Sequence, residues 1–173
     1  MKINILLPFK EKFDLDKASS VSITVKNNLC HSKYLKNIRI FGQKVEKPIY
    51  EDNFIGVDYS YLSFKSKNTF LADTMLNIIS KSDDQKQLVE IHNRPYLIDR
   101  IFKDKKIPIS LFLHNDPQTM KGSKSSKERK KILERCQAVF CVSEFIKNRF
   151  LENIFQNKKK VHVLYNGVDK KLK

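Results

Sequence analysis

Several features that mark large classes of proteins are absent from this sequence. No apolar run is long enough to cross a bilayer, and residues 1–8 are charged too early to be a signal peptide. There is no Gly-x-Ser-x-Gly, no Walker-type phosphate loop and no Gly-x-Gly-x-x-Gly. These absences argue against a hydrolase of that type, an NTPase and a dinucleotide-binding enzyme.

Cysteine is also scarce. Cys30, Cys136 and Cys141 show none of the paired spacings that zinc sites and disulfide frameworks use. The last two lie in or beside a segment expected to be core. We therefore expect reduced, packed thiols in a cytoplasmic protein, without metal ligation or disulfides.

Acidic residues are too few to balance the basic ones, so the formal net charge is +15. Of the 34 basic residues, 28 are lysine, and they are spread along the whole chain. Arginine, which makes bidentate contacts to bases and phosphates, is rare. We interpret this charge first as a solvated surface, second as a surface for anionic membrane lipid, and last as a nucleic-acid surface, which is the least favoured of the three. The densest basic stretch is Lys121–Lys131, so peripheral attachment to the inner face of the cytoplasmic membrane is the alternative to a purely cytoplasmic location.

What is present is a regular alternation of short apolar runs and amphipathic segments, with no repeat and no low-complexity linker. A chain of 173 residues with 40% hydrophobic residues is long enough for one domain with a real core. The fold class that this predicts is α/β: a single Rossmann-like domain with a mainly parallel sheet and helices on both faces. The expected strands are residues 3–7, 37–41, 54–59, 88–91, 109–113, 138–142 and 161–165. The expected helices open near residue 18 and cover residues 67–81, 96–106, 123–135 and 143–155, while residues 8–17 are expected to form a polar loop.

The segment after that loop is ambiguous. Val21, Ile23 and Val25 alternate as in a strand, whereas Val21, Val25 and Leu29 lie on one face of a helix. Two serines precede the run and are good N-cap residues, so we predict a helix.

One short pattern occurs twice and organises the rest of the chain. An apolar run ends at His92-Asn93-Arg94-Pro95, and a second ends at His114-Asn115-Asp116-Pro117. Proline forces the preceding residue out of helical geometry, so each strand should end where the polar cluster begins. With the helix expected between them, the two runs form a parallel strand–helix–strand unit. Because ligands of such sheets bind beyond the carboxyl ends of the strands, we expect His92 and His114 side by side at that edge.

Each of these residues also has an ordinary structural interpretation. His92 and His114 could be tied to local backbone, Asn93 and Asn115 could cap turns before proline, and Arg94 could be a surface charge. Two histidines in matching contexts favour a functional site, with His114 favoured more than His92. Arg94 at the mouth of a crevice could pair with a phosphate or an acidic sugar.

The order of these signals resembles the N-terminal half of a family 4 glycosyltransferase of the GT-B type. The resemblance rests on the two His-Asn-x-Pro strand ends, on Val142-Ser143-Glu144 before a helix, and on Asn166-Gly167-Val168-Asp169 near the end of the chain. It covers nearly the whole chain, and the order of the motifs is more specific than any one of them.

The resemblance implies a Rossmann-like acceptor-side domain over residues 1–169 and the start of an interdomain linker over residues 170–173. The second domain, which would hold the nucleotide-sugar donor, has no counterpart in this sequence, so the missing half or a split-enzyme partner is expected. Family members often carry a glycine pair at the turn after the first strand, facing the donor phosphates. This chain has Ser19 and Ser20 there, where a helix N-terminus still offers N–H groups to an anion.

By resemblance, the reaction is transfer of a sugar from a nucleotide-sugar to a cell-envelope glycan or lipid-linked acceptor, with retention of configuration. No cofactor or metal is expected. The residue expected to be catalytic is His114, in contact with the donor sugar or its phosphate. The residues expected to bind donor phosphate or substrate are Ser19, Ser20, His92, Asn93, Arg94, Asn115 and Asp116. The alternative is a non-enzymatic, basic α/β module that binds an anionic membrane surface or nucleic acid.

Overall fold

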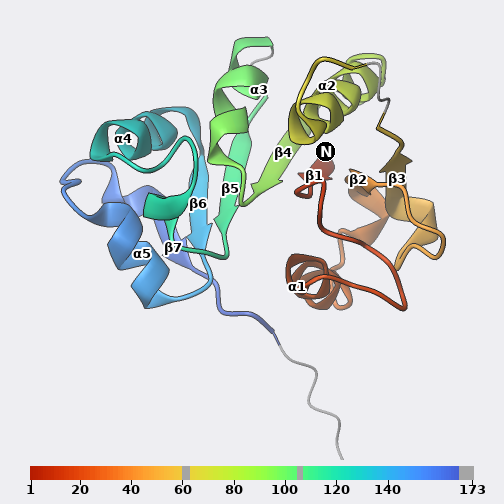
Figure 1. Cartoon of the computed structure of the whole chain (residues 1–173), viewed down its shortest axis with the longest axis horizontal. Coiled ribbons are helices and arrows are strands. Elements are labelled where there is room, and N and C mark those ends of the chain that lie inside the picture. Colours follow the sequence, from red (N-terminus) through yellow and green to blue (C-terminus); the bar gives the residue numbers. More distant parts are fainter. Residues whose placement is uncertain (60–62, 105–106, 168–173) are drawn as a thin grey trace, which may run out of the picture.

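A computed structural model describes residues 1–59, 63–104 and 107–167 of the chain. Its centre is one sheet of seven strands in the order β3-β2-β1-β4-β5-β6-β7, and every neighbouring pair is parallel (Figure 1). The strands are β1 (Lys2–Leu6), β2 (Ile38–Gln43), β3 (Phe54–Val57), β4 (Gln87–His92), β5 (Ile109–Leu113), β6 (Ala138–Cys141) and β7 (Val161–Val163). The predicted fold class, a single Rossmann-like α/β domain, is confirmed.

In the described part of the chain, five α-helices cover the two faces of the sheet. They are α1 (Ser20–Leu29), α2 (Lys67–Ser80), α3 (Ile98–Asp104), α4 (Ser126–Arg135) and α5 (Glu144–Leu151). Helix α1 packs over β1 and β2 on one face, while α2, α3 and α4 lie on the other side of the strands (Figure 1). This division follows from right-handed crossovers, because the chain leaves β1 in one direction along the sheet and leaves β4 in the opposite direction.

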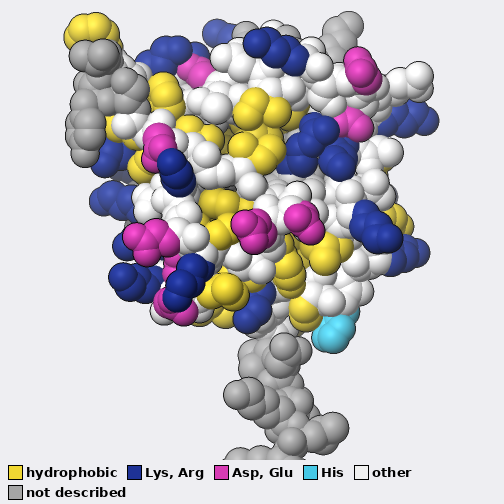
Figure 2. Space-filling model, turned by 90° about the vertical axis from the view of Figure 1, so that its right-hand side faces the viewer, with side chains coloured by type: hydrophobic (Ala, Val, Ile, Leu, Met, Phe, Trp, Pro, Cys, Tyr) yellow, Lys and Arg dark blue, Asp and Glu magenta, His cyan; other side chains and the backbone are white. Residues whose placement is uncertain are grey.

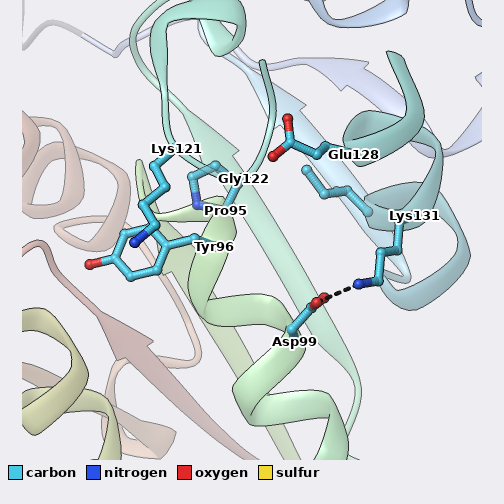
Figure 3. A pocket seen from close by; sticks show the side chains of 8 residues that line it. Pro95, Tyr96, Asp99, Lys121, Gly122, Glu128 and Lys131 are labelled. Carbon is cyan, nitrogen blue, oxygen red and sulfur yellow. Dashed lines mark hydrogen bonds and ion pairs between the residues drawn. The ribbon is translucent and has the colours of Figure 1, made fainter. Parts of the chain in front are cut away.

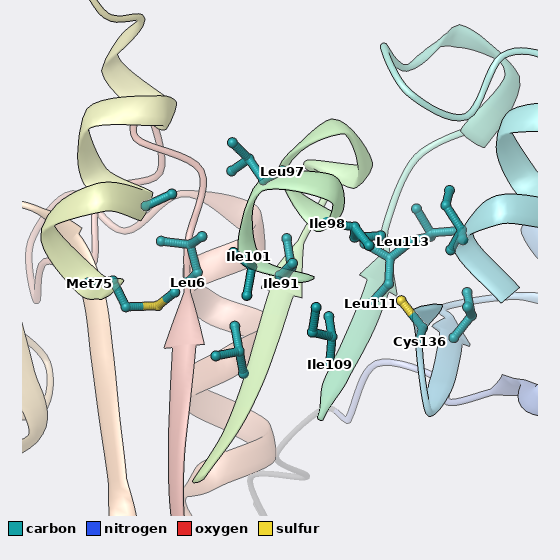
Figure 4. Packing of buried hydrophobic residues seen from close by; sticks show 14 of the residues in the cluster. Leu6, Met75, Ile91, Leu97, Ile98, Ile101, Ile109, Leu111, Leu113 and Cys136 are labelled. Atoms are coloured by element: carbon teal, nitrogen blue, oxygen red, sulfur yellow. The ribbon is translucent and has the colours of Figure 1, made fainter. Parts of the chain in front are cut away.

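The larger part of the core lies between the sheet and helices α2 to α5. Leu6, Ile91 and Leu111 reach it from three adjacent strands, and Met75 and Ile101 reach it from two helices (Figure 4). All five side chains are at most 1% exposed. Helix α2 contributes residues at helical spacing, since Leu71, Ala72, Met75, Leu76 and Ile79 are its buried positions.

Helix α1 resolves the ambiguous segment in favour of the predicted helix. Its buried apolar side chains, Val21, Val25 and Leu29, pack on Ile5 and Ile40 of the sheet. The alternating residue Ile23 is 45% exposed. The helical spacing therefore describes the packing, and the strand-like alternation does not.

Several predicted boundaries are wrong by a few residues. The last helix ends at Leu151 and not near residue 155, because Glu152 leaves helical geometry with a ψ of 124° and Asn153 has a φ of 60°. Strand β7 ends at Val163, and the exposed Leu164 and Tyr165 lie beyond it. The other outcomes are that β3 ends at Val57, that α4 begins at Ser126, and that residues 105–106 and 168–173 lie outside the described residues.

The segment expected to be a polar loop, residues 8–17, is partly core. Phe13 is fully buried and its ring stacks on Phe54 at 5.6 Å between centroids. Phe9 is 8% exposed and belongs to the core on the opposite face. The loop thus joins both cores while it carries the chain from β1 to α1.

One of the basic residues in the predicted basic stretch Lys121–Lys131 is not on the surface. Arg129 is 2% exposed and donates hydrogen bonds to four backbone carbonyls, those of Phe150, Ser123, Lys124 and Glu152, at 2.7–3.1 Å. Burial lowers the pKa of this guanidinium. Arg129 therefore fastens the loop before α4 to the end of α5.

On the face seen in Figure 2, Lys and Arg side chains lie among acidic and hydrophobic ones. The interpretation of the net charge as a solvated surface stays a prediction.

Candidate functional site

The two His-Asn-x-Pro segments meet at the carboxyl edge of the sheet. Strands β4 and β5 are neighbours, with Ile91 opposite Leu111 and His92 opposite Phe112. The order of the strands reverses between β1 and β4, since β2 and β3 lie to one side and β5 to β7 to the other. In sheets of this kind, the crevice beyond the carboxyl ends at such a reversal is where ligands bind.

His92 and His114 are in direct contact, as predicted. Nδ1 of His92 lies 2.8 Å from Nε2 of His114, and the two rings stack with 5.1 Å between centroids. His92 is fully buried, and Nε2 of this ring lies 2.7 Å from Oε1 of Glu90. His114 is only partly buried.

The His92 side chain is buried. Sequence reasoning placed His92 among the residues that bind substrate, and the structure shows that its ring is fully buried and in contact with His114. Binding of a substrate by His92 stays a prediction.

The His114 ring is held uncharged. Desolvation, together with the nearby His92, lowers the pKa of His114 from 6.5 to about 3. Two rings in hydrogen-bond contact repel each other when both are protonated, and a partly buried ring loses hydration when it is charged. At neutral pH His114 can therefore accept or donate one hydrogen bond as a neutral imidazole, but it does not supply a positive charge.

Asn93 holds His114 in place. It sits in the left-handed region with a φ of 49°, which asparagine tolerates better than most residues. The Asn93 N–H donates to the carbonyl of Phe112, and Oδ1 of Asn93 accepts the N–H of His114 at 2.8 Å. Arg94 is half-buried and donates from Nη1 to the carbonyl of Asn93. Direct binding of a ligand by Asn93 or Arg94 stays a prediction.

In the second motif, His114-Asn115-Asp116-Pro117, Asn115 is exposed and Asp116 has a structural role. Asn115 is exposed at the turn after β5. Asp116 caps the 3-10 helix Pro117–Thr119 by accepting the N–H of Gln118, and its other oxygen accepts Nε of Arg149 at 3.0 Å. Asp116 thus ties this turn to α5, and no described contact aims it at a ligand.

The two serines lie at the start of α1, as predicted, but they differ. Ser19 is the N-cap by position, yet its hydroxyl accepts the N–H of Lys12 at 2.9 Å and makes no cap hydrogen bond to the helix. Ser20 is the first residue of the helix and is exposed. The N–H groups of the first turn lack intrahelical acceptors, so an anion role for this end of α1 remains a prediction.

Sequence reasoning missed Glu90, which completes the row of polar groups. A signal was present, because residues two apart on a strand point to the same face, which places Glu90 beside His92. A carboxylate in an otherwise buried strand needs a hydrogen-bond partner, and Nε2 of His92 is that partner for Glu90.

The described residues hold no cluster of three or more His, Cys, Asp or Glu side chains that could bind a metal ion. Cys136 and Cys141 are buried, and burial raises the pKa of each thiol to about 12. No helix in the described part of the chain has the length and hydropathy needed to span a membrane.

A pocket of about 240 Å³ lies on the other face, between α3 and the loop that leads to α4 (Figure 3). Lys121 lies over the ring of Tyr96, 5.3 Å from its centroid, and Lys131 pairs with Asp99. Gly122 has a φ of +88°, and a Cβ at this position would meet the backbone of Tyr96 at 2.6 Å. The basic loop is therefore packed closely against the start of α3.

Solved structures of other proteins share this fold. Anabaena HepE in complex with UDP and glucose aligns with a TM-score of 0.58 and 15% identity, over 98% of this chain and 45% of that one. UDP-N-acetylglucosamine 2-epimerase from Rickettsia bellii aligns with a TM-score of 0.53 and 12% identity, over 96% of this chain and 45% of that one. The chain thus spans about half the length of each, and at these identities the likeness shows the fold alone. Among curated proteins no match was found.

A comparison with protein-family models identifies the family. The model for Glycosyltransferase Family 4 matches residues 37–172, which is most of the chain and includes both His-Asn-x-Pro motifs. That match agrees with the resemblance found in the order of the motifs, and with the N-terminal half of a GT-B architecture. The chain belongs to glycosyltransferase family 4.

Proposed function

We propose that this chain is the acceptor-side domain of a retaining glycosyltransferase. It moves a sugar from a nucleotide-sugar to a cell-envelope glycan or a lipid-linked acceptor, without a metal ion. The observation that carries the proposal is the contact between His92 and His114 at the reversal of strand order in a family 4 domain. Asn93 supports this contact by accepting the backbone N–H of His114. Polar groups at that edge face the crevice in which such sheets bind ligands.

The donor site is proposed to need a second domain. The chain corresponds to 45% of HepE, whose structure contains UDP and glucose. In this proposal, the nucleotide-sugar lies between the two domains, and the first turn of α1 helps to balance the charge of the departing diphosphate. His114 faces the reacting groups from the side of the domain described above.

The chain alone is expected to be inactive, and the chain joined to its second domain is expected to be active. The second domain would be supplied by the continuing reading frame or by a neighbouring gene. Release of nucleoside diphosphate from a panel of nucleotide-sugars, with a glycolipid extract as acceptor, measures the activity of the chain alone and of the two-domain protein. Rapid release by the chain alone would contradict the two-domain proposal. Lack of activity in both, with folded proteins, would favour the non-enzymatic binding module.

The loop and helix over Lys121–Lys131 are proposed to attach the domain to anionic lipid. Lys124, Lys127 and Lys130 are exposed, whereas Lys131 is paired with Asp99 and Arg129 is buried. Each lysine near an anionic surface contributes about 1 kcal/mol, an attraction that salt screens.

Replacing Lys124, Lys127 and Lys130 together with glutamine is therefore expected to weaken binding to phosphatidylglycerol vesicles by about a hundredfold. Co-sedimentation with vesicles at low and high salt measures it. The matched control replaces the exposed Lys12, Lys17 and Lys26, which lie before or in α1, with the same loss of charge. Equal weakening by both triple variants would show a general charge effect, and equal binding to neutral vesicles would contradict the proposal.

A further inference from the structure

A carboxylate and two imidazoles form a continuous row from within the sheet to its carboxyl edge. Oε1 of Glu90 lies 2.7 Å from Nε2 of His92, and Nδ1 of His92 lies 2.8 Å from Nε2 of His114. Glu90 and His92 point to the same face because they are two residues apart on β4. His114 follows the neighbouring strand, β5.

The hydrogen positions in this row follow from which atoms can donate. An ionised carboxylate only accepts, so Nε2 of His92 must carry a hydrogen. A neutral imidazole with its hydrogen on Nε2 has a lone pair on Nδ1, and Nε2–H of His114 donates to that lone pair. The remaining nitrogen of His114, Nδ1, then carries no hydrogen. Within the described residues no hydrogen bond reaches it, and the ring is only partly buried.

The competing arrangement puts a second hydrogen on His92, which would then donate to both neighbours and reverse the tautomer of His114. His92 is fully buried and stacks on the ring of Phe112, with 4.9 Å between centroids. The two arrangements put the hydrogen of His114 on different ring nitrogens, so the tautomer of His114 distinguishes them. The Glu90 side chain is 18% exposed, so its carboxylate keeps some contact with water when His92 is neutral.

We propose that Glu90 and His92 are positioning residues that fix the tautomer of His114, so that Nδ1 of His114 accepts a hydrogen bond at the carboxyl edge of the sheet. The use of this acceptor rests on the proposed function. The chemistry that fits it is a hydrogen-bond donor, such as a hydroxyl of a sugar or of the acceptor. An ionised phosphate oxygen does not fit, because it also only accepts. Of the two contacts expected for His114, with the donor sugar or with its phosphate, this chemistry fits the contact with the sugar.

The tautomer can be measured in the 173-residue chain itself by long-range ¹H–¹⁵N correlation of labelled histidine side chains at neutral pH. His114 is identified by the signals that disappear in His114→Gln. In the native chain, its Nε2 is expected to show the resonance of an N–H nitrogen and its Nδ1 that of an unprotonated one. In Glu90→Gln the amide can donate as well as accept, so His114 is expected to populate both tautomers and both resonances move to intermediate values.

Glu134→Gln is the matched control, since Glu134 is exposed on α4, and it is expected to leave the His114 resonances unchanged. A native His114 with its hydrogen on Nδ1 would overturn the proposal, and so would unchanged resonances in a folded Glu90→Gln. If Glu90→Gln does not fold, the native spectrum decides alone. The measurement uses no substrate, so its failure and the failure of the proposed transferase activity are separate results.

Discussion

Replacing His114 with alanine is expected to lower the turnover of the two-domain enzyme by about a hundredfold or more, the typical loss for one preorganised hydrogen bond to reacting groups. Two contacts hold His114 in place: its Nε2 lies against Nδ1 of His92, and its backbone N–H donates to Oδ1 of Asn93. A group held in this way need not reorganise during the reaction, which is why its removal has a large effect. Steady-state rates of nucleoside diphosphate release measure the change.

Two further variants make the His114 result specific. His162→Ala removes an exposed histidine of β7 and is expected to leave turnover unchanged. His92→Phe keeps a ring that can stack on Phe112 but removes the partner of Nε2, so an intermediate loss is expected. Near-normal turnover in a folded His114→Ala would assign this residue to structure and would withdraw its catalytic role.

Arg129→Met is expected to lower the free energy of unfolding by about 3 kcal/mol or more, because hydrogen bonds to a charged group contribute more than neutral ones and buried acceptors are left without partners. Four carbonyls lose their donor at once: those of Ser123, Lys124, Phe150 and Glu152. Methionine fills a similar volume but donates nothing. Urea unfolding followed by circular dichroism gives the difference.

The neighbouring residue provides the control for Arg129. Lys130 is exposed on the same helix, and Lys130→Met is expected to change the free energy of unfolding by less than about 0.5 kcal/mol. If the two variants unfold at the same urea concentration, the hydrogen bonds of Arg129 contribute little and the loop before α4 is held by other contacts.

The arrangement of the sheet was predictable because it depends on local patterns. Runs such as Ile109–Leu113 are mostly apolar and end at proline-containing turns, and parallel strands joined by a helix usually lie beside each other, as β4 and β5 do. The adjacency of His92 and His114 followed directly from that geometry. The family resemblance, which rests on the order of such strand ends, could be found in the same way.

What escaped prediction depends on contacts between distant parts of the chain. Arg129 looked like one more charge in a basic stretch, since its partners at Phe150 and Glu152 lie about 20 residues later. The sequence predicts that the last helix continues to Phe155, because an apolar residue usually extends the buried face of a helix. In the structure, Phe155 is 81% exposed and lies beyond the end of α5. Burial of His92 could not be read from a motif that looks the same as the one around His114.

The position of β1 in the middle of the sheet has a consequence for how the chain is made. Ile3 of β1 pairs on one side with Ile38 and on the other with Leu88. During synthesis at about 5–20 residues per second, the second edge of β1 stays open for roughly 4–17 s after the strand emerges, until β4 follows. An unpaired parallel edge attracts other strands, and closing so long a loop slows folding. Until β4 is made, the sheet of β1, β2 and β3 therefore exposes a strand edge that a chaperone would protect.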